Sequence, residues 1–151
     1  MTVETRLFGE VYVGDDKIIN LPQGIIGFPD LKKFTLIYDN EKGEDRSIMW
    51  FQSLDEPQFA LPVMTPSTVV PDYNPTVNDE LLAPLGELTE DNLYVLVTVK
   101  VPQDLKEMSV NLKAPIIINS DTLIGGQLIV EDEDLPVRYK IYDILKGNGG
   151  N

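Results

Sequence analysis

The side chains that carry out most enzymatic chemistry are missing from this sequence. Its 151 residues include no histidine and no cysteine. Histidine is the side chain whose ordinary pKa lies near neutrality and is the commonest metal ligand, and cysteine supplies the most nucleophilic thiolate. Ser-His-Asp triads, Cys-His dyads, zinc sites built on these residues and disulfides are therefore excluded. What remains for a small acidic protein is mostly binding.

The densest cluster of carboxylates is the run Glu131-Asp132-Glu133-Asp134. A functional interpretation is a calcium loop or a contact for a basic partner. The run lacks the spaced oxygen ligands and the central glycine of an EF-hand, which argues against calcium. We expect a solvated loop between two strands, and a partner contact in this loop stays open.

Other segments resemble catalytic or phosphate sites only in part. Ser53 has no general base beside it except a carboxylate, which is a poor match for a serine hydroxyl. The segment Gly24-Ile-Ile-Gly-Phe28 lacks the Gly-Lys-Ser/Thr ending of a phosphate loop, and Pro29 follows it. We expect its glycines to permit positive φ while Phe28 and the isoleucines pack inward. Gly125-Gly126 is expected to form a bulge or turn.

Alternation of apolar and polar residues predicts that most of the chain forms β-strands. The clearest strand spans 93–101, where Leu93, Val95, Val97, Val99 and Val101 fall on one face. Further strands are expected at Thr2–Val13, Lys17–Leu21, Phe34–Tyr38, Ile48–Ser53, Phe59–Met64, Ser109–Leu112, Ile116–Ile118 and Gly126–Val130. Many short strands at this spacing favour an all-β fold, mainly antiparallel, arranged as a compact barrel-like single domain.

Three segments are not predicted to be strands. Prolines make Thr65–Thr76 an extended segment, because each proline fixes its φ angle and restricts the residue before it. One short helix is expected at Asp79–Leu85 with Asn78 as its N-cap, and Pro29–Leu31 is compatible with a helical turn. The domain is expected to span 1–145, and the glycine- and asparagine-rich tail 146–151 to be disordered because nothing apolar holds it.

The charge of the chain restricts its partners. It carries 25 acidic and 12 basic side chains, for a net charge of −13. Such a surface repels nucleic acid and anionic lipid and attracts basic proteins, so we expect no direct contact with nucleic acid or membrane. The N-terminus has no signal region, and no apolar run approaches the roughly 20 residues that span a bilayer. We therefore expect a cytoplasmic monomer without a cofactor or metal.

Five segments together resemble the flagellar assembly factor FliW family. They are Leu21–Asp30 (LPQGIIGFPD), Phe51–Asp55 (FQSLD), Phe59–Val63 (FALPV), Leu112–Asn119 (LKAPIIIN) and Gln127–Val130 (QLIV), the last followed by the acidic run and Arg138. Each piece is short, and the specificity comes from their order and spacing. The resemblance covers the chain from about Phe8 to Ile144 and is loosest over Thr65–Leu88.

The resemblance implies a protein-binding role and no catalysis. Its partners would be flagellin and the carbon storage regulator CsrA, which represses translation of flagellin messenger RNA. In the family, the factor holds the regulator inactive until free flagellin displaces it. An acidic chain is also attracted to a regulator that must be basic where it grips RNA, and flagellin's amphipathic terminal helices suggest recognition in a groove.

The candidate contact residues lie in turns of the matching segments that we expect to be exposed. They are Gln52, Asp55, Glu56, Asn111, Lys113, Asp132 and Glu133. A turn-stabilising role alone would explain Asp55, because aspartate side chains commonly hydrogen-bond turn backbone. The other members of this set have the same structural alternative.

Two other functions stay open on the sequence. A hydrolase that uses only carboxylates, such as a glycosidase or a magnesium-dependent phosphatase, needs paired acids in a cleft. The acids here fall mainly in polar turns, which argues against it. A purely structural β-domain would support a larger assembly and leave the RNA occupancy of the regulator unchanged.

Overall fold

The computed structural model describes residues 1–38 and 48–149. Its strands are β1 (Thr2–Thr5), β2 (Gly9–Tyr12), β3 (Ile19–Asn20), β4 (Lys33–Tyr38), β5 (Met49–Ser53), β6 (Ala60–Met64), β7 (Leu93–Lys100), β8 (Ser109–Val110), β9 (Ile116–Asn119), β10 (Ile124–Gln127) and β11 (Tyr139–Lys140). Its helices are α1 (Asp79–Leu82), α2 (Tyr142–Gly149) and 3-10 turns at Asp15–Lys17, Pro66–Thr68, Ala83–Leu85 and Leu105–Glu107. The fold is all-β with few short helices, as the sequence predicts.

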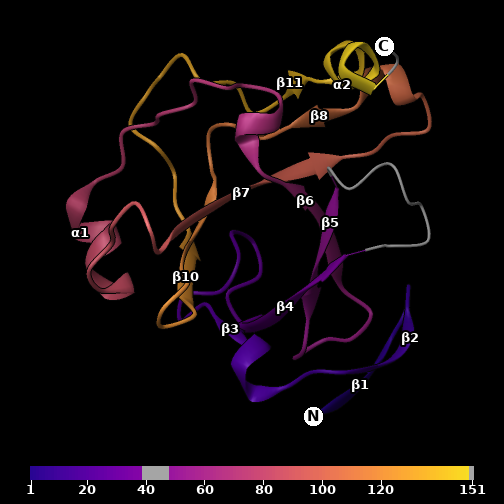
Figure 1. Cartoon of the computed structure of the whole chain (residues 1–151), viewed down its shortest axis with the longest axis vertical. Helices are drawn as coiled ribbons and strands as arrows, with labels where there is room; N and C mark the ends of the chain where they lie inside the picture. The colour runs from indigo at the N-terminus through magenta and orange to yellow at the C-terminus, as the bar shows by residue number, and fades with distance from the viewer. Residues whose placement is uncertain (39–47, 150–151) are drawn as a thin grey trace.

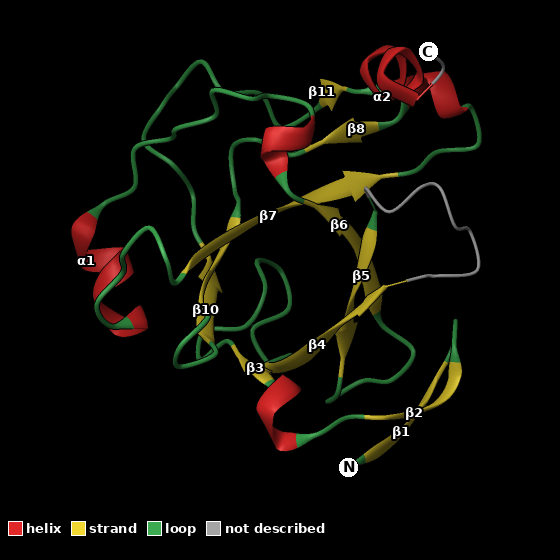
Figure 2. Cartoon of the chain, in the orientation of Figure 1, coloured by secondary structure: helices red, strands yellow, loops and turns green. Residues whose placement is uncertain are grey.

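The strands close into a barrel. Hydrogen-bonded neighbours follow the order β7, β6, β5, β4, β3, β10 and β9, and β9 pairs with β7 to complete the ring. Figures 1 and 2 show the barrel in cross-section. All of these pairings are antiparallel except the one between β3 and β10, which joins Asn20 and Ile124. Two short strands, β8 and β11, extend the sheet from the far end of β7.

Strand β7 separates two hydrophobic cores. Leu96 is fully buried in a core with Phe34 and Phe51, whose rings stack with centroids 4.3 Å apart. Val97, on the opposite face, is fully buried in a second core with Val99 and others. The predicted strand is confirmed, and apolar residues occupy both faces because both are covered. Each fully buried residue of this size contributes roughly 1.5–3 kcal/mol of transfer free energy.

The second core is covered by elements outside the ring. Ile141 and Met64 are completely buried in it, and Ile144 of α2 packs against it. Figure 2 shows α2, β8 and β11 together along one side of the barrel. The helix continues to Gly149, so its backbone is helical at 146–149, where the sequence predicts a disordered tail. Residues 150–151 lie outside the described residues.

The long strand expected at Thr2–Val13 is a hairpin. β1 and β2 pair antiparallel around a turn in which Gly9 has a φ of +64°. The Thr5 hydroxyl donates to the Gly9 carbonyl at 2.8 Å and accepts from the Phe8 amide at 2.9 Å. The prediction missed the turn because its only breaker is one glycine. The strand expected at Lys17–Leu21 is reduced to β3, which follows a 3-10 turn.

The last predicted strand is displaced. β10 begins at Ile124 and ends at Gln127, rather than running over Gly126–Val130. The two glycines lie within the strand and form no turn. A Cβ on Gly125 would lie 2.7 Å from the carbonyl oxygen of Ile117, so close approach to β9 accounts for this glycine.

The loop Gly24–Phe28 holds its glycines as predicted but turns two apolar side chains outward. Gly24 and Gly27 have φ angles of +71° and +89°. The amides of Ile25 and Phe28 each donate to the carbonyl of the other, at 3.2 and 2.7 Å. Ile25 is buried, whereas Ile26 and Phe28 are exposed, which corrects the expectation that all three pack inward.

The region between β6 and β7 confirms the predicted helix. α1 and the 3-10 turn after it cover Asp79–Leu85, and the Asn78 side chain accepts from the Glu80 amide at 2.7 Å. That is the geometry of an N-cap. The preceding proline-rich segment forms no strand, but it is extended only in part. It contains a 3-10 turn at Pro66–Thr68 and a second turn in which the Tyr73 amide donates to the Val70 carbonyl at 3.0 Å. Pro29 and Asp30 form a turn and no helix.

Candidate partner-binding surface

Gln52 is buried and does not lie in an exposed turn. Its side chain is on β5 with 1% of the residue exposed. Its Nε2 donates to the carbonyl oxygens of Ser53 at 2.9 Å, Pro57 at 2.9 Å and Phe59 at 3.2 Å. The expectation of exposure is wrong because β5 is covered on both faces. Phe51 faces the barrel core, Gln52 faces the opposite side, and both are buried. These hydrogen bonds hold the turn between β5 and β6 in place.

The next two candidates belong to the turn that Gln52 clamps. Asp55 is exposed, and its Oδ2 accepts from the backbone amides of Lys32 and Lys33 at 2.7 and 2.8 Å. This carboxylate therefore has a structural role, but it bonds the segment at the start of β4 and not the turn in which it lies. The Glu56 amide donates to the Ser53 hydroxyl at 2.9 Å. Ser53 is fully buried, so its hydroxyl is a structural acceptor.

Three further candidates, Asn111, Lys113 and Asp132, are linked to one another by hydrogen bonds. The Asn111 side chain accepts from the amides of Lys113 at 2.9 Å and Ala114 at 3.2 Å. Lys113 Nζ donates to the carbonyl oxygen of Asp132. Asp132 Oδ1 in turn accepts from the Thr76 amide at 2.6 Å. These residues therefore connect the β8–β9 segment, the acidic loop and the proline-rich segment.

The acidic loop presents its remaining carboxylates to solvent. Glu131, Glu133 and Asp134 are exposed, and none of them forms an ion pair within the described residues. The ion pair found among the described residues joins Lys140 to Glu107 at 2.9 Å, and both side chains are largely exposed. No group of three acidic side chains among residues 1–38 and 48–149 is arranged to hold a metal ion.

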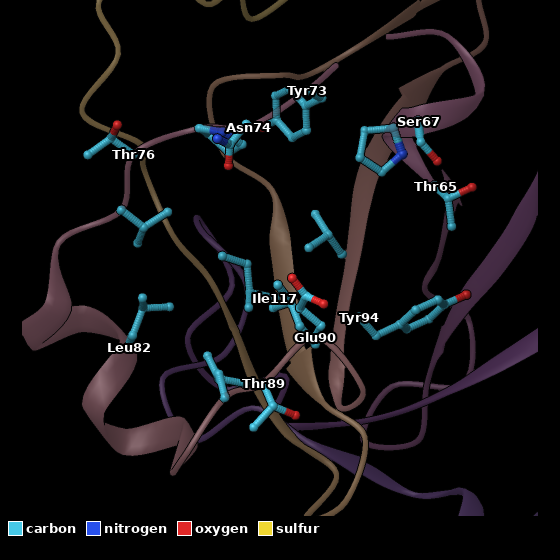
Figure 3. Close-up of a pocket in the computed structure, with 16 residues that line it drawn as sticks. Thr65, Ser67, Tyr73, Asn74, Thr76, Leu82, Thr89, Glu90, Tyr94 and Ile117 are labelled. Atoms are coloured by element: carbon cyan, nitrogen blue, oxygen red, sulfur yellow. The ribbon is translucent and has the colours of Figure 1, made fainter. Parts of the chain in front are cut away.

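A large cleft lies beside the proline-rich segment, and sequence reasoning did not anticipate it. Its volume is about 870 Å³. Figure 3 shows Tyr73, Asn74 and Thr65 along one rim, with Tyr94 and Ile117 contributed by β7 and β9. The residues come from segments far apart in the sequence. Only the tertiary structure brings them together.

Two tyrosines near this cleft have perturbed acidities. Burial, reinforced by the Asp132 carboxylate, raises the pKa of Tyr73 to about 12. Its hydroxyl donates to the Leu112 carbonyl at 2.6 Å. Burial, followed by the neighbouring Tyr38, also raises the pKa of Tyr94 to about 12. Both hydroxyls are therefore neutral donors at physiological pH, and neither can serve there as a base.

The combined geometry defines a protein with acidic loops on a closed barrel and no assembled catalytic group among the described residues. A model of the FliW protein family matches residues 2–141. Two curated proteins named flagellar assembly factor FliW are similar over almost their whole length. The one from Lachnospira eligens is 53% identical over 97% of both chains, and the one from Lachnoclostridium phytofermentans is 46% identical over 95% of this chain and 92% of its own.

This chain belongs to the FliW family. A crystal structure of a flagellar assembly factor FliW aligns with a TM-score of 0.84 at 24% identity, covering 93% of this chain and 96% of that one. At this identity the likeness concerns the fold, and it agrees with the barrel described above. Within the part of the chain that the structure describes, no helix combines the length and apolar character needed to cross a membrane.

Proposed function

We propose that this protein is a flagellar assembly factor that binds the translational regulator CsrA and prevents it from repressing flagellin messenger RNA. Flagellin is its second partner and competes with the regulator, so free flagellin limits its own synthesis. The observation that carries the proposal is the similarity to named flagellar assembly factors along nearly the whole chain. The protein works by binding and has no catalytic role.

The charge of the molecule supports a basic partner. A regulator that grips RNA needs a cationic surface, because phosphate contacts dominate RNA affinity. A net charge of −13 attracts such a protein. At physiological salt, however, the field is screened over a Debye length of roughly 8 Å. The factor must therefore dock close to the RNA site or shift the conformation of the regulator.

Three of the predicted contact residues are less suited to this contact than a position in an exposed turn would make them. Gln52 is internal, and Asp55 and Asp132 each hold a neighbouring loop through backbone amides. Glu133 is exposed and makes no hydrogen bond within the described residues, so its carboxylate is available to a cation. We place the electrostatic contact on the exposed side of the acidic loop, with Glu133 at its centre and Asp132 as its support.

A mixing titration tests the proposal. The purified chain is added to CsrA bound to labelled flagellin leader RNA, and RNA occupancy is followed by fluorescence anisotropy. We expect the RNA to be released, and to rebind when flagellin is added. Unchanged RNA occupancy at saturating chain would instead indicate a purely structural β-domain. Turnover of generic glycoside or phosphate substrates by the same preparation would indicate a carboxylate-based hydrolase and overturn the binding role.

The cellular setting follows from the same proposal. Both partners are made in the cytoplasm, so that is where the factor acts. We expect the free protein to be monomeric, which sedimentation of the purified chain measures.

A further inference from the structure

A second groove on the barrel has a charge opposite to that of the molecule. It has a volume of about 520 Å³ and is lined by the loop after β3, by β6 and β7, and by the segments after β8 and β10. Three basic side chains line it, Lys100, Lys113 and Arg138, and no acidic residue does. This is notable in a chain with 25 acidic and 12 basic side chains.

The groove also gathers exposed apolar side chains. Ile26, Phe28, Ile129 and Val137 line it, with exposed fractions of 50%, 49%, 56% and 58%. Single exposed apolar residues are ordinary, but several around one concave site mark an interaction surface. The floor includes Leu61 of β6, whose strand pairs with β7 only at Val63–Thr98 and Met64–Val97. The groove therefore opens where the two strands stop pairing.

The rim of the groove is held in place before any partner arrives. The Ile26 amide donates to Gln127 Oε1 at 2.9 Å, and Gln127 Nε2 donates to the Ala114 carbonyl at 3.2 Å. Phe28 packs on Phe59 with ring centroids 4.9 Å apart. A rigid rim reduces the conformational entropy lost on binding. The outward position of Ile26 and Phe28 is thus a built feature of the loop.

Two of the three cations have no acidic partner among the described residues. Lys100 and Arg138 are exposed and form no ion pair within the described residues, whereas Lys113 is engaged by the Asp132 carbonyl. An apolar floor between such cations complements a segment that has apolar residues flanked by carboxylates. The segments that line the groove bond to one another, as in the Leu128 amide to the Pro115 carbonyl at 3.0 Å. Recognition there is by side chains, which suits the apolar stripe of a helix.

We propose that this groove is the docking site for an amphipathic helix whose apolar stripe is flanked by acidic residues. The groove shares no lining residue with the acidic run Glu131–Asp134, and it adjoins that run through the bond from Lys113 to the Asp132 carbonyl. This assignment deepens the proposed function and rests on it, because the terminal helices of flagellin are amphipathic, while the peptide test needs neither CsrA nor flagellin. The molecule would then carry two binding surfaces of opposite charge preference.

The test compares two labelled peptides of about 18 residues, long enough to form a helix when bound. They share one leucine stripe and differ only in having glutamate or lysine beside it. The net charge of −13 favours the lysine peptide, whereas the groove favours the glutamate peptide. At 0.15 M salt, where local charges dominate, we expect the glutamate peptide to bind to the intact chain about tenfold more tightly, which corresponds to about 1.4 kcal/mol.

Variants locate the binding. Replacing Lys100 and Arg138 together with glutamate should invert the peptide preference, and Ile26→Ser should weaken binding about tenfold, as expected for one exposed apolar contact. Leu81→Ser, which removes an exposed leucine on α1 outside the groove, is the matched control and should change nothing. Circular dichroism and urea denaturation verify that each variant is folded.

Three results would overturn the proposal. The first is a lysine peptide that binds as tightly as the glutamate peptide or more so. The second is an equal loss in Leu81→Ser and Ile26→Ser. The third is undiminished binding of a glutamate peptide with a central proline, which cannot continue a helix through that residue. None of these results bears on the CsrA titration, so the two proposals fail separately.

Discussion

The amide of Gln52 determines the stability of the β5–β6 turn. Its Nε2 donates to three carbonyl oxygens, while its Oε1 has no hydrogen-bond partner among the described residues. A buried group without a partner costs about 1–3 kcal/mol. The donor side adds bonds to turn carbonyls, two of which also accept from a backbone amide: Pro57 from Arg6 at 3.4 Å and Phe59 from Ser53 at 3.0 Å. Sequence pattern cannot reveal this, since glutamine is usually a surface residue.

We therefore predict that Gln52→Leu lowers the free energy of unfolding by about 1–3 kcal/mol, because the three turn carbonyls lose the bonds from the side-chain amide. Urea denaturation measures the change. Gln58→Leu, the same substitution at an exposed position of the same turn, is the control and should stay within about 0.5 kcal/mol of the parent. A Gln52→Leu chain with parental stability would show that the amide does not clamp the turn.

Tyr73 makes the protein less stable as the pH rises into the alkaline range. Its pKa is raised to about 12 in the folded state, whereas an unfolded tyrosine titrates near 10. Between these values the unfolded state loses its proton first, so the folded state is progressively disfavoured as pH rises. Below pH 10 the contribution is fully present. Tyr94 has the same shift and adds to the effect.

We predict that the free energy of unfolding falls between pH 10 and pH 12, as measured by urea denaturation at several pH values. Tyr73→Phe should reduce that slope, and Tyr73→Phe combined with Tyr94→Phe should reduce it further. The variants are less stable near neutrality because the Tyr73 hydrogen bond to Leu112 is lost. An unaltered slope in the double variant would refute the assignment to these hydroxyls.

At the scale of elements, the loop after β3 depends on one glycine more than on the other. Gly24 has a φ of +71°, and a Cβ there would lie 2.6 Å from the Phe28 and Pro29 carbonyl oxygens. Gly27 has a φ of +89°, but a Cβ on it would meet nothing within 4 Å. Both positions disfavour an L side chain, and only the first also has no space for one.

We predict that Gly27→Ala costs about 1–2 kcal/mol of stability, the usual penalty of left-handed backbone. Gly24→Ala should cost more, since backbone atoms must also move. Thermal unfolding of the pair measures the difference. Equal losses would mean that the close approach of Gly24 to Pro29 is not tight.

Sequence pattern predicted those elements that depend only on their own residues. β7 and the helix at Asp79–Leu85 lie where the pattern and the cap placed them. The displaced β10 and the split Thr2–Val13 show the limit, because both depend on where a neighbouring strand passes. Of the candidate contacts, Gln52 is buried rather than exposed. Asp55 and Asp132 also hold neighbouring backbone, a role that residue type alone does not reveal.

At the scale of the whole molecule, the location of charge matters more than its total. Glu133 and Asp134 are exposed in the acidic loop, and Glu4 and Glu10 are exposed on the N-terminal hairpin. Reversing either pair changes the net charge equally. Steering by the overall field would be altered alike by both changes, whereas docking at the acidic loop is sensitive only to the first.

We predict that Glu133→Lys with Asp134→Lys slows association with CsrA by roughly tenfold at low salt and flattens its salt dependence. Glu4→Lys with Glu10→Lys should have little effect. Stopped-flow kinetics at several salt concentrations distinguish the two. Identical rates for both double variants would move the contact away from the acidic loop. Asp132 is left unchanged, because its bond to the Thr76 amide holds the loop.

Neither concave site could be read from the sequence. The groove joins Ile26 to Val137 and the cleft joins Thr65 to Ile117, so each is made by segments that only the closed barrel brings together. Composition favours a protein-binding role, since a chain without histidine or cysteine has few routes to catalysis. It could not indicate a local reversal of charge, because net charge averages over the whole surface.

The parallel pairing of β3 with β10 also has a consequence for synthesis on the ribosome. β3 is among the earliest strands made, yet its neighbour in the ring ends at Gln127, near the C-terminus. The nascent chain therefore cannot close the ring until Ile124 has been made and can pair with Asn20. Non-local strand pairing of this kind is slow and leaves the chain prone to aggregation. Fragments that stop before Gln127 should be captured by chaperones or degraded.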